Sequence, residues 1–383
     1  MMRGFADEEF AARLDRAQAM MAASGLDALF LTTEPEIRYF TGYLTRFWES
    51  PTRPWYLIVP QSGKPVAVFP SIGAALMEKT WIDDIRTWSS PDPDDDGLSL
   101  LADAIAELLG SDSVIGVPSG HETHLRMPQA DFMRLQSLCP GMRFCGDDGI
   151  IRRLRLIKSD AEIAKIRTAC MIAGRAFDRV GEIAAEGTPL SDVFRKFQML
   201  CLEEGADWVP YLAGGKGAMG YDDVISPASD EPLHHGEVMM LDTGIVHDGY
   251  FCDYDRNYAV GAIKPEVASA WQKLLDATAA GMEAVRPGNT AADIYRAMDR
   301  VLTGGKGGGS AGRLGHGLGM QLTEWPSFIA ADETEITEGM VLTLEPGITM
   351  PDGSILVHED DIVLTADGAI QLSAKAPQQL WVI

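Results

Sequence analysis

Hydrophobic positions in the first 150 residues follow two different periods. Apolar residues recur at helical spacing in four stretches, at 5–24, 35–40, about 97–110 and about 128–138. Short apolar runs typical of buried strands separate them: LDALFLTT, WYLIVP, PVAVFP, SVIGVP and MRFCG. Strands that alternate with helices predict a three-layer α/β unit with a mainly parallel sheet. We expect this unit to end between residues 147 and 157.

A second pattern starts at residue 158. The segment KSDAEIAKIRTACMIAGRAFDRVGEIAAEG predicts a long amphipathic helix with Ser159 as its N-cap. Two halves then follow, each made of helices and then strands: a helix at about 190–204 with strands to 259, then helices at about 265–285 and 290–303 with strands to 364. This repeat predicts an α+β unit with internal pseudo-two-fold symmetry. We therefore divide the chain into domains 1–152 and 153–383.

Composition limits the classes of binding partner and the cellular compartment that we expect. A chain of 383 residues is too long for one ordinary core, in agreement with two domains. Its net charge of −24 makes nucleic acid or an anionic membrane an unfavourable partner. The five cysteines are odd in number and show no CxxC spacing, which indicates free thiols in a reducing compartment such as the cytoplasm. No apolar run approaches the ~18 residues of a membrane span.

Candidate metal ligands lie in two acidic hairpins and one glycine-flanked turn. They are Asp242 and Asp253 in LDTGIVHDGYFCDYDR, His316 in GHGLG, Glu345 in LTLEPG and Glu359 in LVHEDD. Four carboxylates and one imidazole suit a pair of hard or borderline divalent ions. Such a pair generates hydroxide at neutral pH and stabilises developing negative charge.

Local sequence explains how these ligands can converge. A turn at 247–249 would fold the strand of Asp242 back towards Asp253. The glycines beside His316 permit close approach of the backbone to a crowded site. Asp255 lies two residues beyond Asp253, so strand alternation places both on one face of the sheet. Asp255 would then be a ligand, a residue that orients a ligand, or a partner for Arg256.

The order, spacing and flanks of the five residues resemble the pita-bread metallopeptidases: prolidases, aminopeptidases P and methionine aminopeptidases, with the creatinases as metal-free relatives. KSDAEIAKIR is similar to the opening of their catalytic domain, and LFLTTEPEIRYFTGY to their accessory domain, so the resemblance covers essentially the whole chain. It implies a creatinase-like N-terminal α/β domain followed by a pita-bread catalytic domain with internal pseudo-two-fold symmetry. It also implies a homodimer.

The resemblance also implies the metal arrangement. Asp242 would chelate one ion, Asp253 and Glu359 would bridge, and His316 and Glu345 would bind the other. Manganese suits so oxygen-rich a site, with cobalt, iron and zinc as alternatives.

The sequence departs from the peptidases at the groups that contact substrate. Peptidases of this fold usually carry two further histidines; here Tyr221, in AGGKGAMGYDD, and Thr323, in GHGLGMQLTE, stand at those positions. Val357 replaces the arginine that usually precedes the last ligand, and His358 is new. Removing donors to a transition state typically costs on the order of 100- to 1000-fold in rate. These departures predict a poor peptidase.

The sequence supports three alternative hypotheses about function. The preferred hypothesis is a metal-dependent non-peptidase that cleaves a small zwitterionic or cationic solute by hydrolysis or elimination, similar to the dimethylsulfoniopropionate-lyase-like branch of the fold. Its catalytic candidates are Glu345, Tyr221, Thr323 and Asp255. The alternative is an Xaa-Pro dipeptidase or aminopeptidase, with other groups replacing the missing histidines. The third, a non-catalytic binding module, is opposed by the complete ligand set.

Aromatic residues near these motifs are candidates for substrate binding. Trp208, Tyr211 and Trp325 would surround a cationic group through cation–π attraction, or would simply pack. Trp48 and Arg53 lie in YLTRFWESPTRPW, which resembles a loop that reaches the partner's site in dimers of this family; a solvated loop is the alternative. The segment GGKGGGSAG (304–312) lacks the GK[ST] ending of a phosphate loop, so we interpret it as a flexible connection.

Overall fold

The computed structural model describes residues 3–50, 53–307 and 312–383. The chain divides into two compact units, Met1–Arg155 (unit 1) and Leu156–Ile383 (unit 2). The sequence placed the boundary after residue 152, within helix α6 (Ile150–Leu156), an element that it did not predict. Residues 51–52 of the proposed partner-reaching loop and 308–311 of the glycine-rich connection lie outside the described residues.

Unit 1 is built on one six-stranded sheet of order β4-β3-β2-β1-β5-β6. Its strands are β1 (Ala28–Leu31), β2 (Tyr56–Pro60), β3 (Val66–Pro70), β4 (Asp84–Trp88), β5 (Val114–Val117) and β6 (Arg143–Gly146). Only β2 runs against its neighbours, because its pairings with β1 and β3 are antiparallel whereas β1·β5, β3·β4 and β5·β6 are parallel. The predicted mainly parallel sheet is confirmed.

The helices of unit 1 include the four predicted stretches and two short helices, at 74–77 and 150–156, that the sequence did not predict. They are α1 (Asp7–Ser24), α2 (Glu34–Thr41), α3 (Ala74–Met77), α4 (Leu98–Leu108), α5 (Gln129–Leu138) and α6, with short 3-10 turns η1 (Phe47–Glu49) and η2 (Ser71–Gly73). α1 ends at Gly25, whose φ of 66° is the left-handed conformation that favours glycine at a helix C-terminus.

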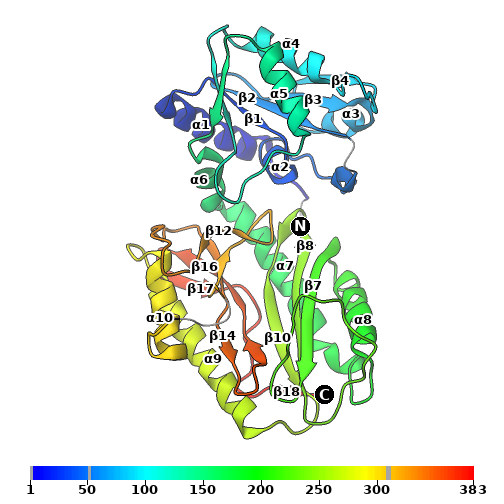
Figure 1. Ribbon diagram of the computed structural model, residues 1–383, viewed down its shortest axis with the longest axis vertical. Coiled ribbons are helices and arrows are strands. Elements are labelled where there is room, and N and C mark those ends of the chain that lie inside the picture. The colour runs from blue at the N-terminus through cyan, green and yellow to red at the C-terminus, as the bar shows by residue number, and fades with distance from the viewer. Residues whose placement is uncertain (1–2, 51–52, 308–311) are drawn as a thin grey trace. The chain divides into compact units, whose positions relative to one another are not determined.

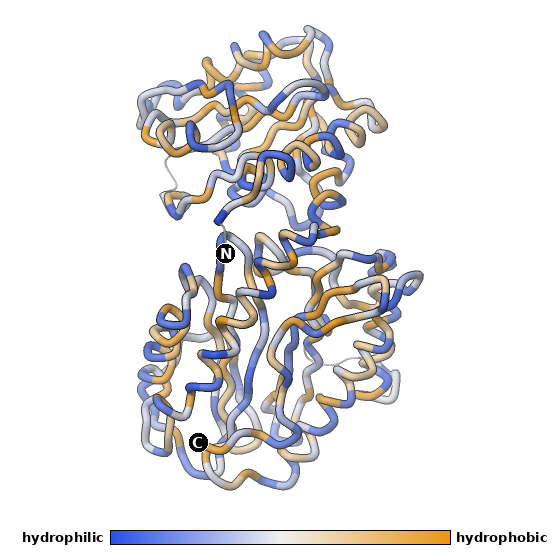
Figure 2. The backbone as a smooth tube through the Cα atoms, turned by 180° about the vertical axis from the view of Figure 1, so that it is seen from behind, coloured by the Kyte–Doolittle hydropathy of each residue, from blue (hydrophilic) through white to orange (hydrophobic). Residues whose placement is uncertain are grey.

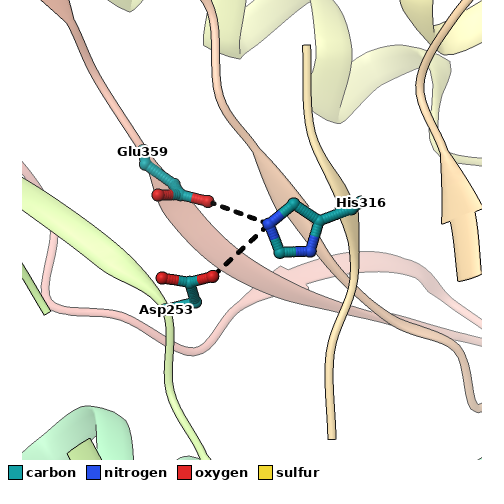
Figure 3. Close-up of side chains that lie close together, drawn as sticks. All are labelled: Asp253, His316 and Glu359. Carbon is teal, nitrogen blue, oxygen red and sulfur yellow. Dashed lines mark ion pairs between the residues drawn. The ribbon is translucent and has the colours of Figure 1, made fainter. Parts of the chain in front are cut away.

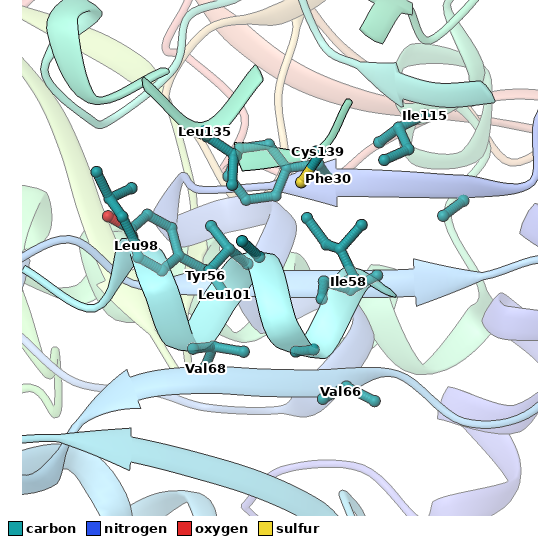
Figure 4. Packing of buried hydrophobic residues seen from close by; sticks show 14 of the residues in the cluster. Phe30, Tyr56, Ile58, Val66, Val68, Leu98, Leu101, Ile115, Leu135 and Cys139 are labelled. Carbon is teal, nitrogen blue, oxygen red and sulfur yellow. The ribbon is translucent and has the colours of Figure 1, made fainter. Parts of the chain in front are cut away.

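A buried apolar cluster holds α4 and α5 to the sheet of unit 1 (Figure 4). Leu98 and Leu101 of α4 belong to the same cluster as Tyr56, Ile58 and Val68 of the neighbouring strands, and all five side chains are at most 1% exposed. Burying a large apolar side chain contributes roughly 1.5–3 kcal/mol. The cluster therefore gives unit 1 a core of its own.

The first half of unit 2 places two helices beside a sheet (Figure 1). Its elements are α7 (Asp160–Asp178), η3 (Val180–Glu182), α8 (Leu190–Glu203), β7 (Trp208–Gly217), β8 (Val238–His247), β9 (Tyr250–Phe251), β10 (Tyr254–Ala259) and the C-terminal β18 (Trp381–Val382). The sheet has the order β18-β10-β8-β7, and β9 pairs with β8. Ser159 caps α7 by accepting the Glu162 N–H, as predicted, although the helix ends at Asp178 and does not reach residue 187.

The second half repeats this plan. Its elements are α9 (Pro265–Ala284), α10 (Ala291–Thr303), β11 (His316–Gly317), β12 (Glu324–Ser327), β13 (Val341–Leu344), β16 (Asp360–Thr365) and β17 (Gly368–Gln371), with a small ribbon of β14 (Gly347–Thr349) and β15 (Ile355–Val357). The larger sheet has the order β12-β11-β13-β16-β17. Two helices followed by a sheet in each half confirm the predicted internal repeat.

Hydropathy along the backbone explains this packing. In Figure 2 hydrophobic and hydrophilic stretches alternate along the helices of both units, as expected for helices with one buried face. Trp271 and Leu274 of α9 are buried together with Met240 of β8, and Met298 of α10 is buried with Leu342 of β13. Among the described helices, none has the length and apolar character that crossing a membrane requires.

Candidate metal centre

The first acidic hairpin is formed by β8 and β9. Their ladder pairs Val246 with Phe251 and His247 with Tyr250. The connecting residues Asp248 and Gly249 have φ values of 48° and 83°, as a tight two-residue hairpin turn requires. The turn predicted at 247–249 is thus confirmed.

The two aspartates of this hairpin occupy different positions. Asp242 lies within β8 and faces Asp255 of β10 across the ladder. Asp253 lies between β9 and β10, immediately before Tyr254 begins the next strand. The short break in pairing brings Asp253 to the sheet margin, where its carboxylate is available to groups of the second half.

The second acidic pair lies at one end of the β13·β16 ladder. Leu344 pairs with Asp360, so Glu345, which follows β13, and Glu359, which precedes β16, lie at the same end. Pro346 follows Glu345 and has no N–H to continue a ladder, which explains why β13 ends there. Glu359 therefore stands just before its strand.

His316 reaches the site because glycines flank it. A Cβ on Gly317 would overlap the carbonyl oxygen of Trp325, and one on Gly315 would overlap the carbonyl oxygen of Thr343. Gly315 also has a φ of 134°, which L side chains rarely adopt. The close backbone approach inferred from the sequence is confirmed at both positions.

Three of the five proposed ligands meet directly (Figure 3). The His316 Nε2 atom lies 3.3 Å from Asp253 Oδ2 and 3.8 Å from Glu359 Oε1. All three residues are at most 4% exposed, and their ligand atoms lie within 4.8 Å of one another. Side chains from both halves of unit 2 thus converge at the spacing of a metal site.

Asp242 extends the same cluster. Its Oδ2 atom accepts a hydrogen bond from the Tyr211 hydroxyl at 3.0 Å. Asp242 Oδ1 and Glu359 Oε1 are buried atoms with no hydrogen-bond partner among the described residues. Buried carboxylate oxygens left without donors are the ligands that hard divalent cations prefer. The residues present therefore fit the implied metal ions.

Electrostatics leads to the same conclusion. Burial and the charges of Asp255 and Glu345 raise the pKa of Asp242 well above its ordinary value. Burial, with Asp242 as the next cause, likewise raises the pKa of Asp253. Burial and Asp253 raise the pKa of Glu359. Carboxylates this close cannot all ionise without a compensating cation.

The pKa values of the other two candidate ligands, Glu345 and His316, also suit metal binding. Burial raises the pKa of Glu345 to about 7. Burial and the nearby charge of Arg313 lower the pKa of His316 to about 3, so its imidazole is neutral and has a lone pair for a metal. Glu345 and Asp242 are partly exposed, unlike Asp253, His316 and Glu359. The cluster therefore opens to solvent on the side of Glu345 and Asp242.

Arg313 belongs to the site, although sequence analysis did not propose it. The arginine is partly exposed, and its Nη2 atom donates to Thr323 Oγ1 at 3.2 Å. Its positive charge offsets part of the effect of burial, which raises the pKa values of Asp253 and Glu345. The guanidinium therefore lies close to the ligands. Its position three residues before His316, in RLGHG, was the available clue.

Tyr221 is held by protein groups. The side chain is 1% exposed, its hydroxyl accepts the Val357 N–H at 2.7 Å, and it lies 3.3 Å from Asn257 Oδ1. A backbone bridge between Tyr221 and Ile355 fixes the same segment. These contacts give Tyr221 a structural place beside β15, and a catalytic role for it stays a prediction.

Asp255 lies in a buried charged network. His358 Nδ1 is 3.4 Å from Asp255 Oδ1, and His358 Nε2 is 3.1 Å from Asp360 Oδ2. Although burial opposes its charge, Asp360 and Asp255 raise the pKa of His358 to about 9. Arg256 pairs with Asp360 at 2.9 Å. The side chain that pairs with Arg256 is thus that of Asp360. This contact argues against one of the three roles considered for Asp255, that of partner for Arg256.

The aromatic residues proposed from the sequence lie in different surroundings. Tyr211 bonds a metal ligand, Trp208 at the start of β7 is partly exposed, and Trp325 in β12 is 7% exposed. In unit 1, Trp48 packs against Trp55 with ring centroids 5.5 Å apart. Substrate roles for these residues stay predictions.

The neighbourhood of Arg53 is ordered by similar contacts. Its guanidinium lies over the Phe47 ring, 5.1 Å from the centroid. Trp48 is only 9% exposed, whereas the Arg46 and Glu49 side chains of the same segment are 54% and 76% exposed. A role for Arg53 or Trp48 in a partner's site stays a prediction.

Comparisons with known proteins agree with this geometry. A model of metallopeptidase family M24 matches residues 164–366, and a model of the creatinase/prolidase N-terminal domain matches residues 13–157. The chain is 29% identical over 386 residues to the probable dipeptidase PepE of Mycobacterium tuberculosis, covering 100% of this chain and 98% of that protein. It is 32% identical over 231 residues to the Xaa-Pro dipeptidase of Pyrococcus furiosus, covering 59% of this chain and 65% of that protein.

A solved structure matches along the whole chain. The crystal structure of dipeptidase PepE from Mycobacterium ulcerans has a TM-score of 0.85 and 28% identity, and the match covers 99% of each chain. These dipeptidase relatives contradict the preference for a non-peptidase of the dimethylsulfoniopropionate-lyase-like branch, which was wrong. They support the alternative, a peptidase.

Substituting Gly317 tests how His316 is positioned. We expect Gly317→Ala to lower metal affinity at least tenfold, because the new Cβ would push β11 away from Trp325. Isothermal titration with Mn²⁺ measures this loss. Gly181→Ala, at an exposed glycine of the same unit with open space around its Cβ and no positive φ, is the control for a general glycine effect. Wild-type affinity in Gly317→Ala would contradict this account.

The raised carboxyl pKa values predict a pH dependence of metal binding. Protons held by Asp242, Asp253 and Glu359, and by Glu345 with its pKa of about 7, must leave when a cation binds. Affinity should therefore rise as pH increases from about 6 to about 8. Titration calorimetry in buffers of different ionisation enthalpy counts the released protons. Binding without proton release at about pH 6.5 would refute the prediction.

Proposed function

The chain belongs to metallopeptidase family M24, and on that premise we propose that it is a dipeptidase that hydrolyses Xaa-Pro dipeptides. The observation that supports this most is the buried meeting of Asp253, His316 and Glu359. Dipeptidase relatives over the full chain support the choice of a small peptide as substrate. The chain is accordingly a metal-dependent hydrolase.

Five residues would hold two divalent ions: Asp242, Asp253, His316, Glu345 and Glu359. Four carboxylates and one neutral imidazole favour manganese, with cobalt, iron or zinc as alternatives. When bound, the two cations supply Lewis-acid chemistry that activates water and polarises the scissile carbonyl.

The chain's own groups complete the reaction. Glu345 is partly exposed at the open side of the cluster, where a carboxylate can take a proton from water and return it to the leaving amine. Tyr211 holds Asp242 through its hydroxyl and fixes the direction of that carboxylate. Asp253 and Glu359, which are buried, keep their carboxylates away from bulk water.

Arg313 and Thr323 supply donors near the same open side. The guanidinium carries five N–H groups, and the described contacts use one of them, to Thr323. We infer that the others bind an oxygen of the substrate that carries negative charge, either the C-terminal carboxylate or the oxyanion that forms during hydrolysis. This would compensate for the two histidines that the sequence lacks.

Assembly and location are further parts of the proposal. All five cysteines are free, which supports a reducing compartment such as the cytoplasm. We also infer a homodimer, in which the segment that carries Trp48 and Arg53 would approach the partner's substrate. Light scattering would measure the mass in solution.

Turnover of a peptide panel tests the proposed activity. We expect the manganese-loaded protein to cleave Gly-Pro and Ala-Pro, and cleavage to stop with a chelator, because the cluster needs its cations. Release of free proline measures the reaction. Dimethylsulfoniopropionate and ectoine serve as comparison substrates. Turnover of a small solute with no cleavage of any dipeptide would refute the proposal.

Substituting Arg313 tests the proposed donor. Arg313→Ala should lower kcat/KM for Ala-Pro on the order of 100-fold, because it removes the cation beside the developing charge. Arg313→Lys should recover part of the rate, since it restores the charge without the forked geometry. Arg300→Ala, on the exposed side of α10, is the control. An Arg313→Ala enzyme as fast as wild type would exclude this role.

A further inference from the structure

The two acidic hairpins carry the same short motif. In the first, the ligand Asp253 is followed two residues later by Asp255; in the second, the ligand Glu359 is followed two residues later by Asp361. Each ligand stands immediately before a strand, β10 or β16. Each following aspartate is the second residue of that strand. The internal repeat of unit 2 thus extends to the residues around the ligands.

Each aspartate bonds the ligand of the other hairpin. Asp255 Oδ1 accepts the backbone N–H of Glu359 at 2.9 Å. Asp361 Oδ2 accepts the backbone N–H of Asp253 at 2.9 Å. All four residues are at most 4% exposed. The two hydrogen bonds are therefore reciprocal and shielded from water.

These two hydrogen bonds give an acceptor to backbone N–H groups that the β-ladders leave unpaired. Asp253 and Glu359 precede their strands, so their N–H groups lie outside the pairings of β10 with β8 and β16 with β13. A buried N–H without an acceptor is costly, and a carboxylate is a strong acceptor for it. Because the donor is the ligand's own backbone, the bond fixes where the ligand side chain begins.

Neighbouring groups keep both acceptors in place. Asp255 also contacts His358 and lies 3.4 Å from Asn257 Nδ2. The Oδ2 atom of Asp361 also accepts from the Cys170 thiol at 3.2 Å. With its Oδ1 bound to the Glu359 N–H, Asp255 is better placed to orient a ligand than to be one. This narrows the roles that sequence left open for Asp255.

We propose that Asp255 and Asp361 are positioning residues that form a reciprocal brace between the two hairpins and set the spacing of Asp253 and Glu359. The inference rests on the proposed two-metal function and adds residues to it. Because each bond of the brace joins the two hairpins that together would supply the ligands, loss of one arm should weaken the binding of both ions together. A residue that served one ion alone would weaken that ion only.

Metal binding by paired variants tests the brace. Asp255→Ala and Asp361→Ala remove an acceptor, whereas Asp255→Asn and Asp361→Asn keep an acceptor oxygen and remove the charge. We expect each Ala variant to lose at least tenfold in affinity for both Mn²⁺ ions, and each Asn variant to stay within about threefold of wild type. Calorimetry gives the affinities, and electron paramagnetic resonance of the manganese pair reports its spacing. Asp276→Ala, on the exposed face of α9, is the matched control.

The outcomes separate the brace from other roles. Ala variants that bind both ions like wild type would overturn it. Asn variants that lose metal as fully as Ala variants would also overturn it, because charge or direct ligation would then be the cause. Circular dichroism of the metal-free proteins checks folding; if the Ala variants do not fold, the Asn pair decides.

The same experiment separates the brace from the proposed activity. A wild-type protein that binds two ions but cleaves no dipeptide would refute the proposed substrate, and the brace would still be decided by the variants. A wild-type protein that binds no metal would overturn both.

Discussion

Unit 2 depends on one electrostatic constraint: several carboxylates and an imidazole are buried together and need a compensating positive charge. Burial raises the pKa values of Asp242, Asp253 and Glu359 and lowers that of His316. Without cations the carboxylates retain protons, and with cations they become ligands. Burial of these carboxylates without a compensating charge would oppose folding, and bound cations would remove that cost.

The internal repeat of unit 2 brings such a cluster together. Three of the five candidate ligands stand just outside strands: Asp253 precedes β10, Glu345 follows β13 and Glu359 precedes β16. Glycines at 315 and 317 allow the histidine strand to approach closely. Carboxylates of Asp255 and Asp361 accept the backbone N–H groups left over. The ligands are thus held by the same hydrogen bonds that join the two halves.

The groups around the metal ligands show how a substrate site can change while the ligands stay. Thr323 replaces a histidine but accepts a hydrogen bond from Arg313, which brings a positive charge close to Asp253 and Glu345. Weighing the missing histidines alone pointed away from a peptidase, and the dipeptidase relatives showed that inference to be wrong. A donor lost at one position says little until its neighbours in space are known.

Sequence by itself determined the two-unit plan, most helices, the turn at 247–249 and the ligand candidates, because these depend on local periodicity, turn chemistry and residue type. Tertiary structure alone decided which of those residues meet. Asp253, His316 and Glu359 are far apart in the chain, and Asp361 acquires its role only through a contact across the two halves. Arg313 acquires its role through its place beside Thr323 and near Asp253 and Glu345. It also showed that Tyr221 is enclosed by backbone groups of β15. Hydrogen bonds between distant segments leave no periodic trace in a sequence, so only the folded chain reveals them.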